Sequence, residues 1–181
     1  MNLGTTIVQA LYFFLPAYVS NMAPVALGKL NIFRTPVDFN KTYNDKPIFG
    51  KHTTGGGRIY GTVAGTLMFI VQQKLYTNSF FKTISIIEYP QWSIALGILL
   101  AAGAILGDLA KSFIKRRLNK ESGSPWFPFD QLDFVIGGLL FASPLIIPHG
   151  GIIFILIVLT PILHYGANYL GFYLRLKRVK W

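Results

Sequence analysis

Three aspartates stand at the ends of two apolar segments in the second half of the chain. Asp108 follows one segment, and Asp130 and Asp133 precede the next, three residues apart. A helix that begins there places the last two on one face. Carboxylates beside a membrane are costly unless they are paired or bind a cation, and oxygen ligands without cysteine or a nearby histidine suit Mg²⁺. The spacing predicts a metal site of three aspartates, with helix capping or topological charge as the alternative.

Cations fill the connection between these aspartates: Lys111, Lys115, Arg116, Arg117 and Lys120. Positive groups beside a carboxylate–metal site are what phosphoryl transfer requires, because they neutralise charge on phosphate oxygens. We expect Lys111, Lys115 and Arg116 to contact phosphate. For Arg117 and Lys120, anchoring of a helix to anionic lipid head groups explains the charge equally well.

A second polar connection, residues 44–61, combines cations, hydroxyls and glycines. Its candidate substrate-binding residues are Lys46, Lys51, Thr53, Thr54, Gly57 and Arg58. Exposed backbone N–H groups and hydroxyls can cradle a phosphate, although the P-loop pattern and its preceding strand are missing. A flexible connector would have a similar composition.

The composition shows what must position these groups. Of the 181 residues, 52% are hydrophobic and 13% charged, against about 25% charged in soluble domains. The absence of cysteine excludes disulfides and thiolate metal sites. Five apolar runs approach the roughly 20 residues that cross a bilayer: 3–27, 59–76, 92–106, 132–148 and 152–174. The sequence predicts an all-α polytopic membrane protein, one domain over residues 1–181 with about five transmembrane helices.

Basic residues alternate between the connections, and this alternation predicts the orientation. Residues 28–58 hold six Lys and Arg and residues 107–131 hold five, whereas 77–91 hold one and 148–151 none. Because cytoplasmic loops carry excess Lys and Arg, the amino terminus is expected outside, and both long loops and the carboxyl terminus in the cytoplasm. Membrane topology also accounts for the net charge of +10 without a nucleic-acid partner, since no basic recognition module surrounds the cations.

Two glycines in the second apolar run, Gly61 and Gly65, have the GxxxG spacing. Small residues four apart let membrane helices approach closely. We therefore expect a close helix contact at this point of the second run.

The charged stretch resembles the cytidylyltransferases that make CDP-activated lipids, whose signature runs roughly S-x-x-K-R, K-D, G, P, H-G-G and D-R-x-D. The matching residues are Ser112, Lys115, Arg116, Lys120, Gly123, Pro128, Asp130 and Asp133. Glu121 stands for the signature Asp and Gln131 for its Arg. H-G-G is absent before Asp130, and the H-G-G at residues 149–151 follows the D-x-x-D and is expected on the other side of the membrane.

Within these enzymes, a chain of 181 residues with about five spans looks like the archaeal branch, the CDP-archaeol synthase family. The segment LPAYVSNMAPV, residues 15–25, is similar to the first span of that family, and residues 44–61 align with its second conserved region. Residues 53–57 read TTGGG where K-T-W-R-G is usual in the family.

The resemblance implies a reaction between CTP and unsaturated archaetidic acid, 2,3-bis-O-(geranylgeranyl)-sn-glycerol 1-phosphate. The implied products are a CDP-lipid and pyrophosphate, formed at the cytoplasmic face of the cell membrane. The implied cofactor is Mg²⁺, and the sequence does not decide whether a second cation is needed. A lipid phosphate is already an anionic nucleophile, so no catalytic base is required. Asn21 either contacts the lipid phosphate or bonds another helix. His164, in the last span, poses the same choice, and we expect it to be packed or hydrogen-bonded.

Two other functions compete with this interpretation. A CDP-alcohol phosphotransferase is a related lipid-phosphate enzyme, but its D-G-x-x-A-R and spaced D-x-x-x-D pattern is absent. A small membrane transporter or scaffold is the third possibility. Transporters bury their charges near the middle of the membrane, whereas here the charges gather at one end of the spans.

Overall fold

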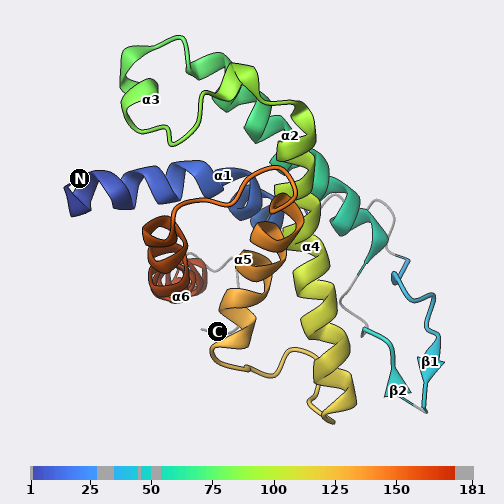
Figure 1. The fold of residues 1–181 in the computed structure, drawn as a ribbon. Helices are drawn as coiled ribbons and strands as arrows, with labels where there is room; N and C mark the ends of the chain where they lie inside the picture. The colour runs from blue at the N-terminus through green and yellow to red at the C-terminus, as the bar shows by residue number, and fades with distance from the viewer. Residues whose placement is uncertain (1, 28–34, 45, 50–53, 174–181) are drawn as a thin grey trace.

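The computed structural model describes residues 2–27, 35–44, 46–49 and 54–173. Within them the chain is mostly helical, which confirms the expected class. The helices are α1 (Leu3–Leu27), α2 (Gly55–Leu75), α3 (Ser79–Thr83), α4 (Ile94–Arg117), α5 (Phe129–Ala142) and α6 (Gly150–Tyr173) (Figure 1). A small antiparallel hairpin of β1 (Thr42–Tyr43) and β2 (Lys46–Pro47) precedes α2, and a 3₁₀ turn, Tyr89–Gln91, precedes α4.

Three helices of the described residues are long and apolar enough to cross a membrane: Leu3–Pro24, Ile94–Arg117 and Gly150–Leu170. Of the other two expected spans, α2 carries Arg58 and Lys74 near its ends, and α5 has only 14 residues. The protein is therefore a helical membrane protein, while the count of five spans and the orientation stay predictions.

The helix boundaries differ from those expected. The third run was expected to end at Leu106, yet α4 continues to Arg117. Asp108, Lys111 and Lys115 recur at helical spacing on one face, so the helix has no reason to stop where charge begins. The fourth run was expected to reach residue 148, but α5 ends at Ala142.

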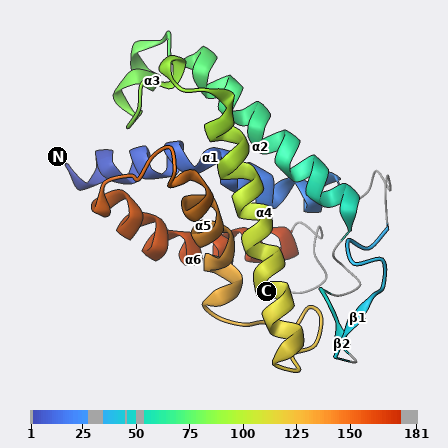
Figure 2. The ribbon, with the colours of Figure 1, turned by 45° about the vertical axis from the view of Figure 1, so that its right-hand side comes forward.

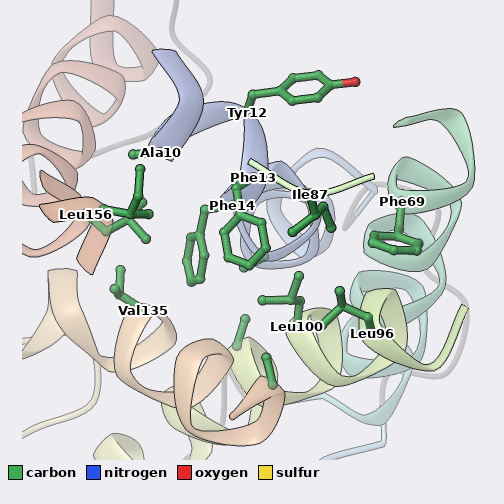
Figure 3. Close-up of a cluster of buried hydrophobic side chains, with 14 of the residues drawn as sticks. Ala10, Tyr12, Phe13, Phe14, Phe69, Ile87, Leu96, Leu100, Val135 and Leu156 are labelled. Atoms are coloured by element: carbon green, nitrogen blue, oxygen red, sulfur yellow. The ribbon is translucent and has the colours of Figure 1, made fainter. Parts of the chain in front are cut away.

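The core surrounds α1, which packs against α2, α4, α5 and α6. Its buried aromatic residues Phe13 and Phe14 lie among Phe69, Leu100 and Val135 of the neighbouring helices (Figure 3). This packing fixes the relative positions of α2, α4 and α5, the three helices that carry the candidate site.

Glycine contacts bring α4 and α5 together along their backbones. A Cβ atom on Gly107 would collide with the carbonyl oxygen of Asp133, and one on Gly137 would collide with that of Gly103. Only glycine allows such an approach. The contact places Asp108, the residue after Gly107, beside the first turn of α5.

The expected close contact at the second apolar run is confirmed. A Cβ atom on Gly61 would lie 2.6 Å from the carbonyl oxygen of Ser20, and one on Gly65 would collide with that of Pro16. The glycines thus hold the first half of α2 against α1, and Arg58 lies one turn before them.

Candidate active site

The last three turns of α4 present a charged face. Asp108, Lys111, Ser112 and Lys115 stand at positions i, i+3, i+4 and i+7, which point to the same side of a helix. The start of α5 lies alongside (Figures 1 and 2) and carries Asp130 in its first turn and Asp133 just after it. Two helices that are adjacent in the chain and in contact at their glycines thus build the site.

The three predicted aspartates converge on one cation, the ammonium group of Lys111. Its Nζ lies 2.9 Å from Asp108 Oδ1, 3.1 Å from Asp130 Oδ1 and 2.8 Å from Asp133 Oδ2. The Asp133 side chain is only 5% exposed, and its Oδ1 accepts a hydrogen bond from the Phe134 N–H at 2.6 Å. The sequence predicted that these carboxylates would meet, but not that a lysine would stand between them.

The donor set suits a hard cation, and Lys111 holds the position where such a cation would bind. Carboxylate oxygens are preferred ligands of Mg²⁺, at 2.0–2.1 Å. Among the residues that the structure describes, no three acidic or histidine side chains already form a metal-binding group. Asp133 Oδ2 is buried, and its one described polar contact is the Lys111 ammonium at 2.8 Å. The residues therefore fit Mg²⁺ once Lys111 withdraws, and the metal site remains a prediction.

Arg58 links the second polar connection to this cluster. It lies in the first turn of α2, and its Nη1 lies 2.5 Å from Asp108 Oδ2. Both side chains are largely buried, at 18% and 23% exposed. The ion pair brings together residues 50 positions apart in the chain, which the sequence placed in separate loops.

Lys115 points into the connection between α4 and α5. Its Nζ donates to the carbonyl oxygen of Ser124 at 2.5 Å and to both oxygens of Asp130, at 3.1 and 3.2 Å. Asp130 Oδ2 also accepts from the Trp126 N–H at 2.6 Å. These contacts give Lys115 and Asp130 a structural role in folding the connection back toward α5. Phosphate contact by Lys115 stays a prediction.

Arg116 and Lys120 also contact the same connection. Arg116 donates to the carbonyl oxygen of Glu121 at 3.1 Å and is 9% exposed. Lys120 Nζ lies 5.8 Å from the centre of the Trp126 ring. The two cations therefore pack within the protein, and a contact of Arg116 with phosphate stays a prediction.

Arg117 holds the hairpin against the end of α4. Its guanidinium donates to the carbonyl oxygens of Tyr43 at 2.5 Å, Lys46 at 3.3 Å and Pro47 at 2.5 Å. It also lies over the rings of Tyr43 and Phe113, at 5.4 and 4.8 Å from their centres. Neither phosphate contact nor head-group anchoring, the two roles left open for Arg117, is tested by these contacts; the structure shows Arg117 packed against the hairpin, which lies beside the end of α4 (Figure 2).

The other candidate residues of the second connection contact the protein in different ways. Lys46 Nζ donates to the carbonyl oxygen of Arg117 at 3.2 Å. The Thr54 hydroxyl caps α2 by accepting from the Gly57 N–H at 3.4 Å. A Cβ atom on Gly57 would lie 3.3 Å from the side chain of Pro24. Lys51 and Thr53 lie outside the described residues, and substrate binding by this set stays a prediction.

Three remaining candidates lie on helices. Asn21 is half-buried on α1, one turn before the Pro24 contact, so it lies toward the α2 end that carries Arg58. Ser112 is half-buried on the charged face of α4. His164 is half-buried on α6 and has an interaction partner, in accord with the packed or bonded residue that we expected.

Asp38, which was not among the residues predicted from the sequence, organises the segment before α2. Its carboxylate accepts hydrogen bonds from the N–H of Asn40 at 3.0 Å and of Phe49 at 3.1 Å. Phe39 and Asn40 both have positive φ, at 50° and 59°. An aspartate two residues before an asparagine is a turn signal that could have identified this segment as folded.

Comparison with known proteins places the chain among lipid enzymes. Residues 3–181 match the family model described as CarS-like, CDP-archaeol synthase. The CDP-archaeol synthase of Pyrococcus furiosus is 40% identical over 178 residues, covering 97% of this chain and 98% of that protein. The CDP-archaeol synthase of Thermococcus kodakarensis is 36% identical over 178 residues, covering 98% of each. A solved structure described as an intramembrane enzyme for archaeal membrane lipids biosynthesis has a TM-score of 0.74 and 29% identity, covering 90% of this chain and 94% of that chain.

Proposed function

Because the chain belongs to the CDP-archaeol synthase family, as its charged stretch indicated, we propose that the carboxylate cluster between α4 and α5 is its active site. The protein is a CTP-dependent cytidylyltransferase of archaeal membrane-lipid synthesis. The observation that carries the site assignment is the convergence of Asp108, Asp130 and Asp133 within 3.1 Å of one cation.

The reaction that we assign joins CTP to unsaturated archaetidic acid. An oxygen of the lipid phosphate attacks the α-phosphorus of CTP, the bond to the β-phosphate breaks, and pyrophosphate leaves with that electron pair. The nucleophile is already an anion, so the site needs no general base. Its task is to align two anionic substrates and to neutralise charge as it moves to pyrophosphate.

The side chains at hand match that task. Asp108, Asp130 and Asp133 are the residues that would hold Mg²⁺, which when bound offsets the negative charge on phosphate oxygens. Arg58 and Lys111 are the cations that we assign to the triphosphate, because both contact the cluster. Lys115 and Arg116 keep the α4–α5 connection folded around the site.

The arrangement of the two polar connections supports a site at one membrane face. The Arg58–Asp108 pair and the Arg117 contacts with the hairpin put both connections at the same end of α4. A shared end is what the positive-inside rule requires of two basic loops. We place this end in the cytoplasm, where CTP is available, and assign the neighbouring Asn21 to the lipid phosphate.

Product analysis tests the reaction directly. Purified protein in detergent is incubated with Mg²⁺, CTP and unsaturated archaetidic acid, with ATP, GTP and UTP in parallel, and lipids are identified by mass spectrometry. We expect a CDP-lipid and pyrophosphate with CTP only, and neither in excess EDTA. No nucleotide-linked lipid from protein that elutes as a single folded species would contradict the proposed function. Product that survives EDTA would contradict the metal requirement alone.

A further inference from the structure

Lys111 is the most heavily shared cation of the site. Each of the three aspartates contacts its ammonium group, at 2.8–3.1 Å, and its side chain is 14% exposed. Three carboxylates this close repel one another strongly unless a positive group stands between them. In this structure Lys111 is that group.

The other two cations are bound differently. Arg58 contacts Asp108 alone among the aspartates, and Lys115 contacts Asp130 alone. Lys115 is also tied to the backbone through Ser124. No described contact ties the Lys111 ammonium to the backbone, and its stem is a flexible four-carbon chain. Lys111 is therefore the cation that can leave the cluster with the least disturbance to the fold.

Departure of Lys111 would affect the three aspartates unequally. Asp108 keeps Arg58, and Asp130 keeps Lys115 and the Trp126 N–H. Asp133 Oδ2 is left with no described partner, in a side chain that is 5% exposed. A buried, unpaired carboxylate oxygen is unstable. A second cation must therefore replace the ammonium as it moves out.

We propose that Lys111 is a tethered counter-ion that exchanges with the catalytic metal and passes to the triphosphate of CTP. This inference rests on the proposed function. The Lys111 ammonium already occupies the space between the three carboxylates, at 2.8–3.1 Å from their oxygens. A Mg²⁺ ion bound by the same three residues would need that space, so the two cations compete. The triphosphate offers the displaced ammonium new partners, and metal and nucleotide binding are coupled through this one side chain.

The test is the effect of Lys111→Met on two affinities. Mn²⁺ binding to the full chain without nucleotide is followed by electron paramagnetic resonance. CTP binding at saturating Mg²⁺ and without lipid is followed by calorimetry. We expect Mn²⁺ to bind about tenfold more tightly to the variant, since a tethered competitor at high effective concentration is gone. CTP should bind about tenfold more weakly, since a charge-assisted contact is lost. A merely structural role would weaken both.

Lys115→Met is the matched control, because it removes one positive charge from the same cluster. It should change Mn²⁺ affinity much less than Lys111→Met does. Equal gains in the two variants would show that net charge alone sets metal affinity and would overturn the exchange. Unchanged Mn²⁺ affinity in Lys111→Met would overturn it as well.

Lys111→Arg keeps the test decisive if the methionine variant fails to fold. The larger guanidinium still occupies the cluster, so Mn²⁺ should bind no more tightly than to the parent protein, and tighter binding would contradict the exchange.

These affinities require no turnover. If CDP-lipid forms and the Lys111 variants leave metal affinity unchanged, only the exchange is wrong. If no CDP-lipid forms, the proposed function is wrong whatever the affinities.

Discussion

The carboxylate cluster and the hairpin segment before α2 are both polar, yet they are held in place by opposite means. The aspartates have short side chains on two helices whose backbones touch at Gly107 and Gly137. The hairpin has two residues in each strand and is held on α4 by the long side chain of Arg117. Backbone contact fixes the first region, whereas side-chain hydrogen bonds, chiefly those of Arg117, hold the second.

This difference matters for a reaction between two anions. Metal ligands must keep their geometry, and side chains on packed helices do so best. A segment that borders a nucleotide site gains from being able to move when the nucleotide enters and leaves. We therefore expect changes at the α4–α5 crossing to affect turnover, and changes at the hairpin to affect nucleotide binding.

Replacement of Asp133 should have the largest effect. Asp133→Asn keeps the shape but removes the charge of the most buried carboxylate, which is 5% exposed. Loss of a group that hydrogen-bonds to a metal ligand typically lowers metal affinity or activity about 10–100-fold. Loss of a ligand itself should therefore lower kcat by about a hundredfold or more. Steady-state assays with CTP and lipid measure this. Near-normal turnover in all three variants, Asp108→Asn, Asp130→Asn and Asp133→Asn, would show that the cluster is not the catalytic site.

A methyl group added at the α4–α5 crossing should have the second largest effect. Gly107→Ala forces a Cβ against the carbonyl oxygen of Asp133, so α4 and α5 must separate. We expect kcat to fall by about tenfold or more, because displacement of reacting groups by about 1 Å can lower the rate 10²-fold. The melting temperature should fall as well. Gly166→Ala is the control: nothing lies within 4 Å of its new Cβ on α6, and it should be neutral or slightly stabilising. Equal behaviour of the two variants would show that the crossing is not tight.

Release of the hairpin should have a smaller and different effect. Arg117→Ala removes three hydrogen bonds to the hairpin carbonyl oxygens. We expect the KM for CTP to rise by about tenfold, as for the loss of one or two charge-assisted bonds, with kcat changed less. Protease cleavage within residues 35–49 should become faster. Arg117→Lys should not restore the parent KM, since one ammonium cannot span the carbonyl oxygens that the guanidinium reaches.

Lys120→Ala is the comparison for Arg117→Ala. Lys120 lies three residues beyond Arg117, in the connection between α4 and α5. It contacts the Trp126 ring rather than the hairpin, so its removal should leave the KM for CTP near the parent value. An equal rise in both variants would point to a general loss of positive charge. A fall in kcat without a change in KM in Arg117→Ala would place the hairpin in the chemical step.

The smallest effect should come from the cap of α2. Thr54→Ala removes the hydroxyl that accepts from the Gly57 N–H, and loss of such a cap costs about 1 kcal/mol of stability. Arg58 lies in the same first turn, so a modest loss of activity should accompany the fall in melting temperature. Thr54→Ser keeps the acceptor and should restore both. Loss of CTP binding without loss of stability would instead assign Thr54 to the nucleotide.

Part of the site could be predicted from the sequence. The three aspartates were identified because carboxylates beside apolar runs are rare and expensive, and the structure brings them together. The Gly61–Gly65 contact followed from spacing in the same way. Gly103 and Gly107 have that spacing too, and recognising it would have predicted a close contact along α4 as well.

Several roles could not be predicted. Lys115 and Arg116 matched a motif for phosphate contact, yet their described bonds go to Ser124 and Glu121 of their own connection. Arg117 was assigned no partner in the protein, because its contacts lie about 70 residues back along the chain. The end of α4 was placed too early, because the first charged residue, Asp108, was taken to mark the end of the helix, whereas the helix continues through it to Arg117.

The sequence by itself determined the helical membrane class, indicated the family and singled out the three aspartates of the proposed site. The class and the aspartates follow from hydropathy, charge and spacing along the chain, and the family follows from the resemblance of its motifs; none of these depends on a tertiary contact. Only the tertiary structure decided which cation stands among the aspartates, which lysines are tied to the backbone, and how the hairpin is attached. Those depend on which helices touch, and at the α4–α5 crossing the contact is set by the absence of side chains at Gly107 and Gly137. Packing in three dimensions, not residue type, assigned each charge its partner.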